Sequence, residues 1–288
     1  MAASNSHFHV RSNSLPSQSN PLLLQCNENL SRLEARGATS SSSFITQRLS
    51  GLEDLHECVE KLLLLPSTQQ AFVQGRQEQW IDQLVDGSLR LLDLCSSAKD
   101  AVLHTKECAR DIQSIMRRRR GAEVGLESEI SKYLASRKVV KRAINKALGS
   151  LKSVETKSSF SDLSNKDGET IALISVLKEV EVVALAVFES LLSFISGPKA
   201  QTKLGGWSLV SKIMHSKRVG CEEEQQVNEF AKVDAAMHRL MSHKMQIEKV
   251  QSELQILEMC VQDFEERLEC LFRRLIKTRV SLLNILNN

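Results

Sequence analysis

This chain of 288 residues has few of the residues that interrupt helices or build sheets. It contains 12 glycines, 4 prolines and only 4% aromatic residues. It also lacks runs of alternating β-branched residues bounded by turn signals, which would predict strands. Leu, Glu, Lys, Gln, Ser and Arg are abundant instead, and these residues favour helix over sheet. We therefore expect an all-α protein.

The motifs that commonly mark an active site are missing as well. Gly205-Gly206 is followed by Trp207, which does not fit a phosphate-binding loop, and no G-x-S-x-G elbow occurs. His238 and His243 are five residues apart, outside the HExxH spacing that places two metal ligands on one helical face. We therefore predict no catalytic residue, no metal ligand and no cofactor, and we expect a protein that is not an enzyme.

The chain shows no feature of a secreted or membrane-spanning protein. Its seven cysteines are an odd number without a CxxC pair, so reduced thiols are predicted rather than a disulfide framework. The most apolar stretch, residues 180–195, contains Glu181 and Glu189 and is too short to cross a bilayer. A Ser-rich start without acidic residues before Glu28 is typical of a chloroplast transit peptide, but it holds a single cation. We favour the cytoplasm, with the chloroplast as an alternative.

Apolar residues recur every three or four positions along the last part of the chain. At 3.6 residues per turn they form one continuous seam on a long helix, and only other helices can cover such a seam. Phe272 and other apolar residues widen the stripe beyond that of a two-stranded coiled coil. Packing within an elongated helical bundle is therefore favoured over a homo-oligomeric coiled coil. The seam consists of Val250, Leu254, Leu257, Val261, Phe264, Leu268, Leu271 and Leu275.

The chain divides into a tail and one helical domain. Residues 1–19 are rich in Ser, Asn, Gln and His and bury too little apolar surface to offset their ordering entropy, so a disordered tail is predicted. Residues 20–288 are predicted to form the domain, with an internal linker near residues 157–167.

Turn and cap residues divide the domain further. Asn20-Pro21 is predicted to begin a short first helix, and Pro66 to end the second. Further helices are expected to begin near residues 77, 127, 168 and 222. A short amphipathic piece is expected at residues 207–219, and a break near Ser242 divides the long C-terminal, coiled-coil-like region.

A phosphorylation motif lies in the tail. Arg11, Ser12, Ser14 and Pro16 form R-S-x-S-x-P, in which an arginine three residues before Ser14 suits basophilic kinases. The phosphorylated form matches the peptide that 14-3-3 phosphoserine adaptors bind through an arginine cluster. Phosphate adds about −1.5 to −2 charges and three hydrogen-bond acceptors. A regulatory site at Ser14 is therefore predicted.

Cations are concentrated in the middle of the chain, although the net charge is only +3. A solvated helix surface is the favoured interpretation, since cations at a helix C-terminus complement the macrodipole. Contact with an anionic membrane surface and nuclear import are the alternatives. No aromatic residues interleave with the four arginines at 117–120, and no DNA- or RNA-binding signature accompanies them, which disfavours nucleic acid as a partner. The predicted basic patch consists of Arg117, Arg118, Arg119, Arg120, Arg137, Lys138, Lys141 and Arg142.

Several segments resemble a plant-specific family related to the BYPASS developmental proteins. The resemblance implies a plant protein that is helical throughout and connected with root and shoot development, and it supplies no catalytic residues. The matching segments are residues 9–16, 89–95, 117–120, 132–138, 189–195, 207–212 and 269–277.

These observations lead to a non-enzymatic intracellular adaptor or regulator as the expected function. It would act through helix-mediated protein interactions, with Ser14 phosphorylation changing its partners. Two alternatives stay open. One is a peripheral membrane protein that binds anionic lipid through a basic helix, and the other is a small-molecule or metal-binding helical bundle. Apolar seams argue against the latter, because such sites need polar residues that project inward from facing helices.

Overall fold

The computed structural model describes residues 20–34, 41–118, 125–152, 167–197, 228–242 and 246–287. All regular secondary structure in these ranges is helical, which confirms the all-α prediction. The predicted tail (residues 1–19), the amphipathic piece (207–219) and most of the 157–167 linker lie outside them. The helices are α1 (Pro21–Glu34), α2 (Ser42–Leu63), α3 (Pro66–Gln74), α4 (Gln79–Arg118), α5 (Leu126–Lys152), α6 (Gly168–Ser196), α8 (Glu229–Met241) and α9 (Ile247–Asn287).

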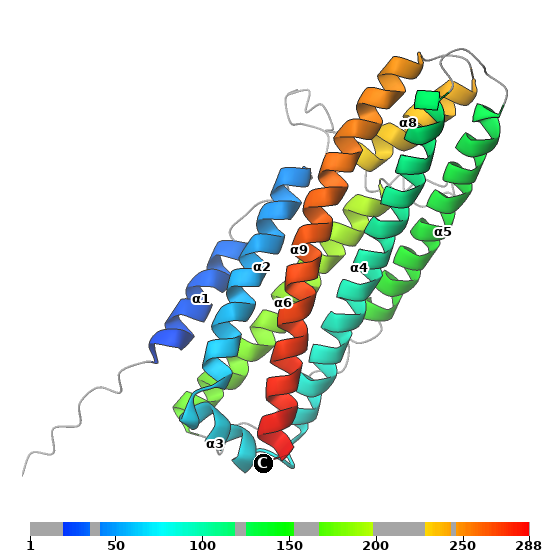
Figure 1. Cartoon of the computed structure of the whole chain (residues 1–288). Coiled ribbons are helices and arrows are strands. Elements are labelled where there is room, and N and C mark those ends of the chain that lie inside the picture. Colours follow the sequence, from blue (N-terminus) through cyan, green and yellow to red (C-terminus); the bar gives the residue numbers. More distant parts are fainter. Residues whose placement is uncertain are drawn as a thin grey trace, which may run out of the picture.

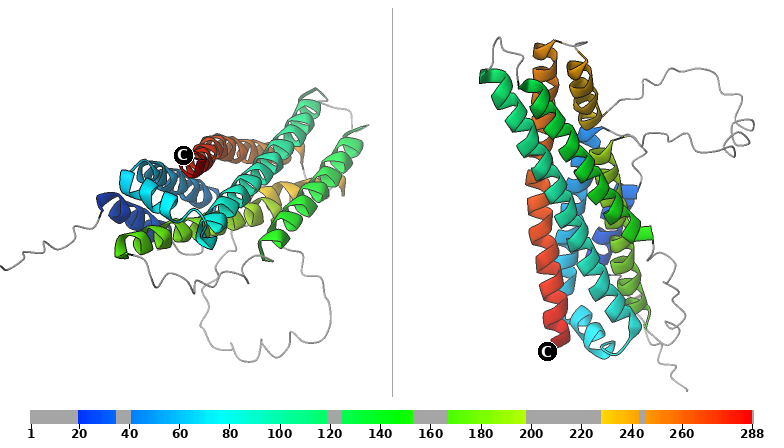
Figure 2. Two further views of the ribbon diagram at one scale, coloured as in Figure 1. Left: turned by 90° about the horizontal axis from the view of Figure 1, so that it is seen from below. Right: turned by 90° about the vertical axis from the view of Figure 1, so that its right-hand side faces the viewer.

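The helices form an elongated bundle with α9 along its length (Figure 1). Both α2 and α4 pack against α9 on one side and against α6 on the other. Helix α1 lies beside α2 at one edge, and α5 lies beside α4 at the opposite edge, as the views in Figures 1 and 2 agree. Helix α8 packs near the end of the bundle against α9 and α5. The edge helices α1 and α5 therefore each present a face to solvent.

The apolar seam of α9 lies in the core. All eight of its residues are buried. Phe264 packs edge to face on Phe194 of α6, and Phe194 packs in the same way on Phe230 of α8. This chain of aromatic contacts ties three helices together. The seam is thus covered within one copy of the chain.

Capping residues account for several helix ends. The side chains of Ser41, Asp167 and Asn228 each accept a hydrogen bond from the first turn of the helix that follows. Helix α6 ends at Gly197, whose φ of 76° is a backbone conformation that favours glycine. Local sequence therefore determines where these helices begin and end.

Two further helix boundaries were predicted from the sequence, at Pro66 and near Ser242. Pro66 does follow the end of α2, but it also begins α3, a helix that was not predicted from the sequence. Proline is favoured at the first position of a helix, where its missing N–H would have no intrahelical partner. The predicted break near Ser242 is confirmed, since α8 ends at Met241 and α9 begins at Ile247.

Candidate functional site: the exposed basic face of α5

The predicted basic patch does not form one continuous surface. Arg117 and Arg118 are exposed at the C-terminal end of α4, whereas Arg119 and Arg120 lie outside the described residues. So do the tail residues Arg11, Ser12, Ser14 and Pro16. The remaining four predicted cations all lie on α5 but point in different directions.

Arg137 is not part of an exposed basic patch, contrary to the prediction, because its side chain is only 3% exposed. Its guanidinium donates to Asp234 at 3.0 Å and to the carbonyl of Ile195 at 2.7 Å. It also lies over the ring of Phe230. Arg137 thus joins α5 to α6 and α8, and it belongs to the core rather than to a basic surface.

Asp234 of α8 is the acidic centre of this buried network. Lys141 contacts its carboxylate at 2.8 Å, and the Tyr133 hydroxyl donates to it at 3.2 Å. Burial by itself would raise the pKa of Asp234, but the charges and hydrogen bonds of Arg137 and Lys141 lower it. Lys141 is therefore also paired with a residue of its own chain.

The outer side of α5 is different. Lys138, Arg142 and Lys146 are exposed and lie one helical turn apart, so they form a row along the helix. No ion pair is formed by these three residues with any part of the chain that the structure describes. We name this row the α5 basic face. Lys146 was not among the predicted patch residues, although its four-residue spacing from Arg142 could have revealed it.

The surroundings of the α5 basic face keep its charge unbalanced. After Glu129, which pairs with Lys132, α5 carries no acidic residue. Val139 lies beside the row and is 57% exposed, which adds an apolar contact point. The face therefore offers three cations and one apolar group to an acidic surface outside the described part of the molecule.

The family that the sequence suggests is supported by comparison. The family described as Protein BPS1 matches residues 48–285. The chain belongs to the BPS1 family. The match agrees with the plant, BYPASS-related proteins that the sequence resembles. No curated protein and no solved structure gave a match.

The BPS1 match covers most of the bundle. It includes the α5 basic face, the Arg137–Asp234 network and the seam of α9, while α1 and residues 42–47 of α2 precede it. None of the helices in the described ranges has the length and apolarity needed to cross a membrane.

The bundle interior contains polar groups that the apolar seams did not predict. His56 of α2 is 2% exposed, and neither of its ring nitrogens has a hydrogen-bond partner among the described residues. Burial, together with the positive charge of Arg274, lowers the pKa of His56 to about 4. His56 is therefore neutral at physiological pH.

His56 lines a cavity of about 50 Å³ between α2, α4, α6 and α9. Thr278 and Ser88 contribute hydroxyl groups to its wall, and Glu181 contributes a carboxylate, but leucine and valine side chains form most of the lining. No group of three or more His, Cys, Asp or Glu side chains arranged to hold a metal occurs in the described ranges. The cavity is smaller than a site for a benzene-sized ligand, which needs about 150 Å³.

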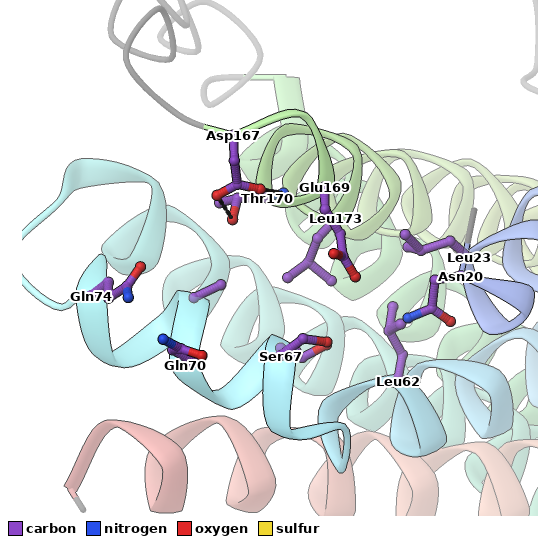
Figure 3. A pocket seen from close by; sticks show the side chains of 12 residues that line it. Asn20, Leu23, Leu62, Ser67, Gln70, Gln74, Asp167, Glu169, Thr170 and Leu173 are labelled. Carbon is purple, nitrogen blue, oxygen red and sulfur yellow. Dashed lines mark hydrogen bonds between the residues drawn. The ribbon is translucent and has the colours of Figure 1, made fainter. Parts of the chain in front are cut away.

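A larger pocket of about 280 Å³ lies where α1, α3 and α6 begin (Figure 3). Several of its polar groups already serve as helix caps. Asn20 accepts from the backbone of Leu22, and Asp167 accepts from both the backbone and the hydroxyl of Thr170. Those hydrogen bonds lower the pKa of Asp167, so it is a poor general acid or base near neutral pH. The α5 basic face stays the stronger candidate.

Proposed function

We propose that this BPS1-family chain is a non-enzymatic adaptor or regulator in plant root and shoot development that acts through protein interactions. The observation that carries the proposal is the α5 basic face, a row of exposed cations without acidic partners among the described residues. The partner surface that fits it is an acidic protein segment, because each cation offers hydrogen-bond donors that a carboxylate accepts.

The dimensions of the α5 basic face favour a short linear partner segment. Lys138 and Lys146 are eight residues apart, so the row extends over roughly 12 Å of helix at 1.5 Å per residue. Exposed charges of this kind increase association rates and selectivity more than they increase affinity. Binding is therefore expected to weaken as the salt concentration rises.

Regulation through Ser14 is part of the proposal and rests on the sequence alone. Phosphorylation would convert the tail into a ligand for a 14-3-3 adaptor, as its arginine and proline spacing indicates. Ser14→Ala bait is expected to lose 14-3-3 proteins while keeping partners bound to α5. We favour the cytoplasm as the site of action.

A charge-reversal pull-down from plant extract tests the α5 basic face. The test variant is K138E/R142E/K146E, and the matched control is R76E/R239E/K249E, which changes net charge equally at three dispersed, exposed positions. Partners that are retained by the wild type and the control but lost from the test variant support the proposal. Identical partner sets for all three baits contradict it.

An anionic membrane surface is the second candidate partner. It is favoured by the position of Val139, which is exposed beside the cations on an edge helix and can insert shallowly into a headgroup region. Flotation with phosphatidylserine-containing and purely phosphatidylcholine vesicles separates the two candidates. Retention by the anionic vesicles alone, lost in K138E/R142E/K146E, would favour lipid; equal recovery with both vesicles would exclude it.

A further inference from the structure

Two buried thiols face each other where α1 packs on α2. The Cys26 thiol donates to the sulfur of Cys58 across 2.7 Å, and the two residues are 0% and 2% exposed. This separation exceeds the length of a disulfide bond, roughly 2.05 Å, by only about 0.6 Å. The two sulfurs therefore already lie close to bonding distance.

Other described cysteines have different neighbours. Cys95 is as deeply buried as Cys26, but it donates to the carbonyl oxygen of Leu268. Cys108 is half-buried and contacts the Ser136 hydroxyl. The contact between Cys26 and Cys58 is thus set by the packing of α1 on α2 and is not a general property of the cysteines here.

A bond between these two sulfurs would link two helices, because the cysteines lie on α1 and α2. Helix α1 lies at the edge of the bundle and packs on α2 and α6 through one buried side (Figure 1). It also precedes the segment matched by the BPS1 family. A bond from Cys26 to Cys58 would attach this peripheral helix covalently to the family domain.

We propose that Cys26 and Cys58 are a modification site that forms an intramolecular disulfide when the protein meets a hydroperoxide. One thiolate attacks the peroxide oxygen, which gives a sulfenic acid and releases hydroxide. The second thiol then attacks the sulfenic sulfur, forms the S–S bond and releases water. Overall, two thiols and one hydrogen peroxide give one disulfide and two waters.

Burial controls when this reaction takes place. Desolvation and the neighbouring thiol raise the pKa of Cys26, so little reactive thiolate exists while α1 is docked. The first oxidation therefore requires α1 to separate transiently from α2, and redocking returns the two sulfurs to contact. Once formed, the bond is enclosed by the same packing and is slow to meet a reductant.

The experiment treats the full-length protein with one equivalent of hydrogen peroxide, followed by intact mass measurement and non-reducing peptide mapping. The expected result is the loss of two hydrogens per chain, with the Cys26 and Cys58 peptides linked, and reversal by dithiothreitol. Unchanged mass, added oxygen alone, or linkage distributed over other cysteines would overturn the proposal.

A second measurement follows α1 itself. Proteolysis between α1 and α2, analysed under denaturing conditions, should release the α1 fragment from the reduced chain and leave it attached in the oxidised chain. C58A should release the fragment in both states, whereas C95A, which removes a buried thiol elsewhere, should behave like the wild type. If C58A does not fold, the wild-type mass and peptide map decide the outcome alone.

Discussion

The two sides of α4 differ in whether their outward-facing cations are paired with acidic residues. On the side formed by α2, α4 and α9, cations face acidic residues of a neighbouring helix. Those pairs include Lys99–Glu269, Lys106–Glu265, Arg110–Glu258, Arg267–Glu53, Arg274–Glu57 and Lys277–Glu60. On the α5 side, Lys138, Arg142 and Lys146 face solvent without such partners in the described structure. Charges on the first side therefore pair helices within the molecule, whereas the cations on α5 can bind a partner molecule.

The largest predicted effect concerns the buried packing that holds α9, the helix carrying many of the paired charges, in the bundle. Phe264→Ala removes a fully buried ring that packs on Phe194. The free energy of unfolding is expected to fall by about 4 kcal/mol, from lost burial and the cavity left behind. Urea denaturation measures the change. Ile276→Ala, on the exposed side of α9, serves as the control and should cost far less.

The second prediction contrasts the inner and outer cations of α5. Arg137→Met leaves the carboxylate of Asp234 with Lys141 as its remaining cation and removes the bond to Ile195, so a loss of about 3 kcal/mol is expected. Lys138→Met, one residue further along, should change stability by less than about 0.5 kcal/mol. Thermal unfolding of both variants tests the contrast, and equal losses would contradict it.

The third prediction concerns acid. The pKa of His56 is about 4 in the folded protein, against an ordinary value of 6.5. Between these values the unfolded chain binds a proton that the folded chain does not, so stability is lost as pH falls from about 6.5 towards 4. The full loss is about 3 kcal/mol at most.

Urea denaturation at a series of pH values measures this effect. His56→Leu should flatten the stability profile over that range. His238→Gln, at an exposed position of α8, should leave the wild-type profile intact. A His56→Leu profile as steep as that of the wild type would show that another group is responsible.

The smallest predicted effect is also the most direct test of the comparison, because its sign differs between the two sides. Replacing Lys138, Arg142 and Lys146 with glutamine relieves repulsion between like charges four residues apart, so stability should rise by about 0.5 kcal/mol. Arg274→Gln on α9 removes the cation that pairs with Glu57 and Glu60, so it should lower stability by about 1 kcal/mol. Denaturant titrations measure both changes, and a stability change of the same sign for the two variants would contradict the difference between the two sides.

Much of the architecture could be predicted because helical information is local. The spacing from Val250 to Leu275 predicted a buried seam on a long helix, and the sequence around Ser242 predicted its break. Helix α3 was missed because Pro66 is compatible both with ending one helix and with beginning the next.

The candidate site was only partly predictable. The sequence indicated a basic region in the middle of the chain but could not separate Arg137, which is buried, from its neighbour Lys138, which is exposed. That separation depends on Asp234, 97 residues further along the chain. Likewise, the position of His56 in the sequence of its helix is compatible with an exposed or a buried ring. Only the packing of four helices around it decides between the two.

The amino-acid sequence by itself determined an all-helical chain, the positions of most helix ends and the apolar side of α9, because hydrogen bonds and periodicity within a helix act over a few residues. Tertiary structure alone decided which cations are neutralised, which stay available on α5, and that Cys26 meets Cys58. The physical reason is that each of these outcomes depends on a contact between helices, and the separation of two residues along the chain does not specify their distance in space.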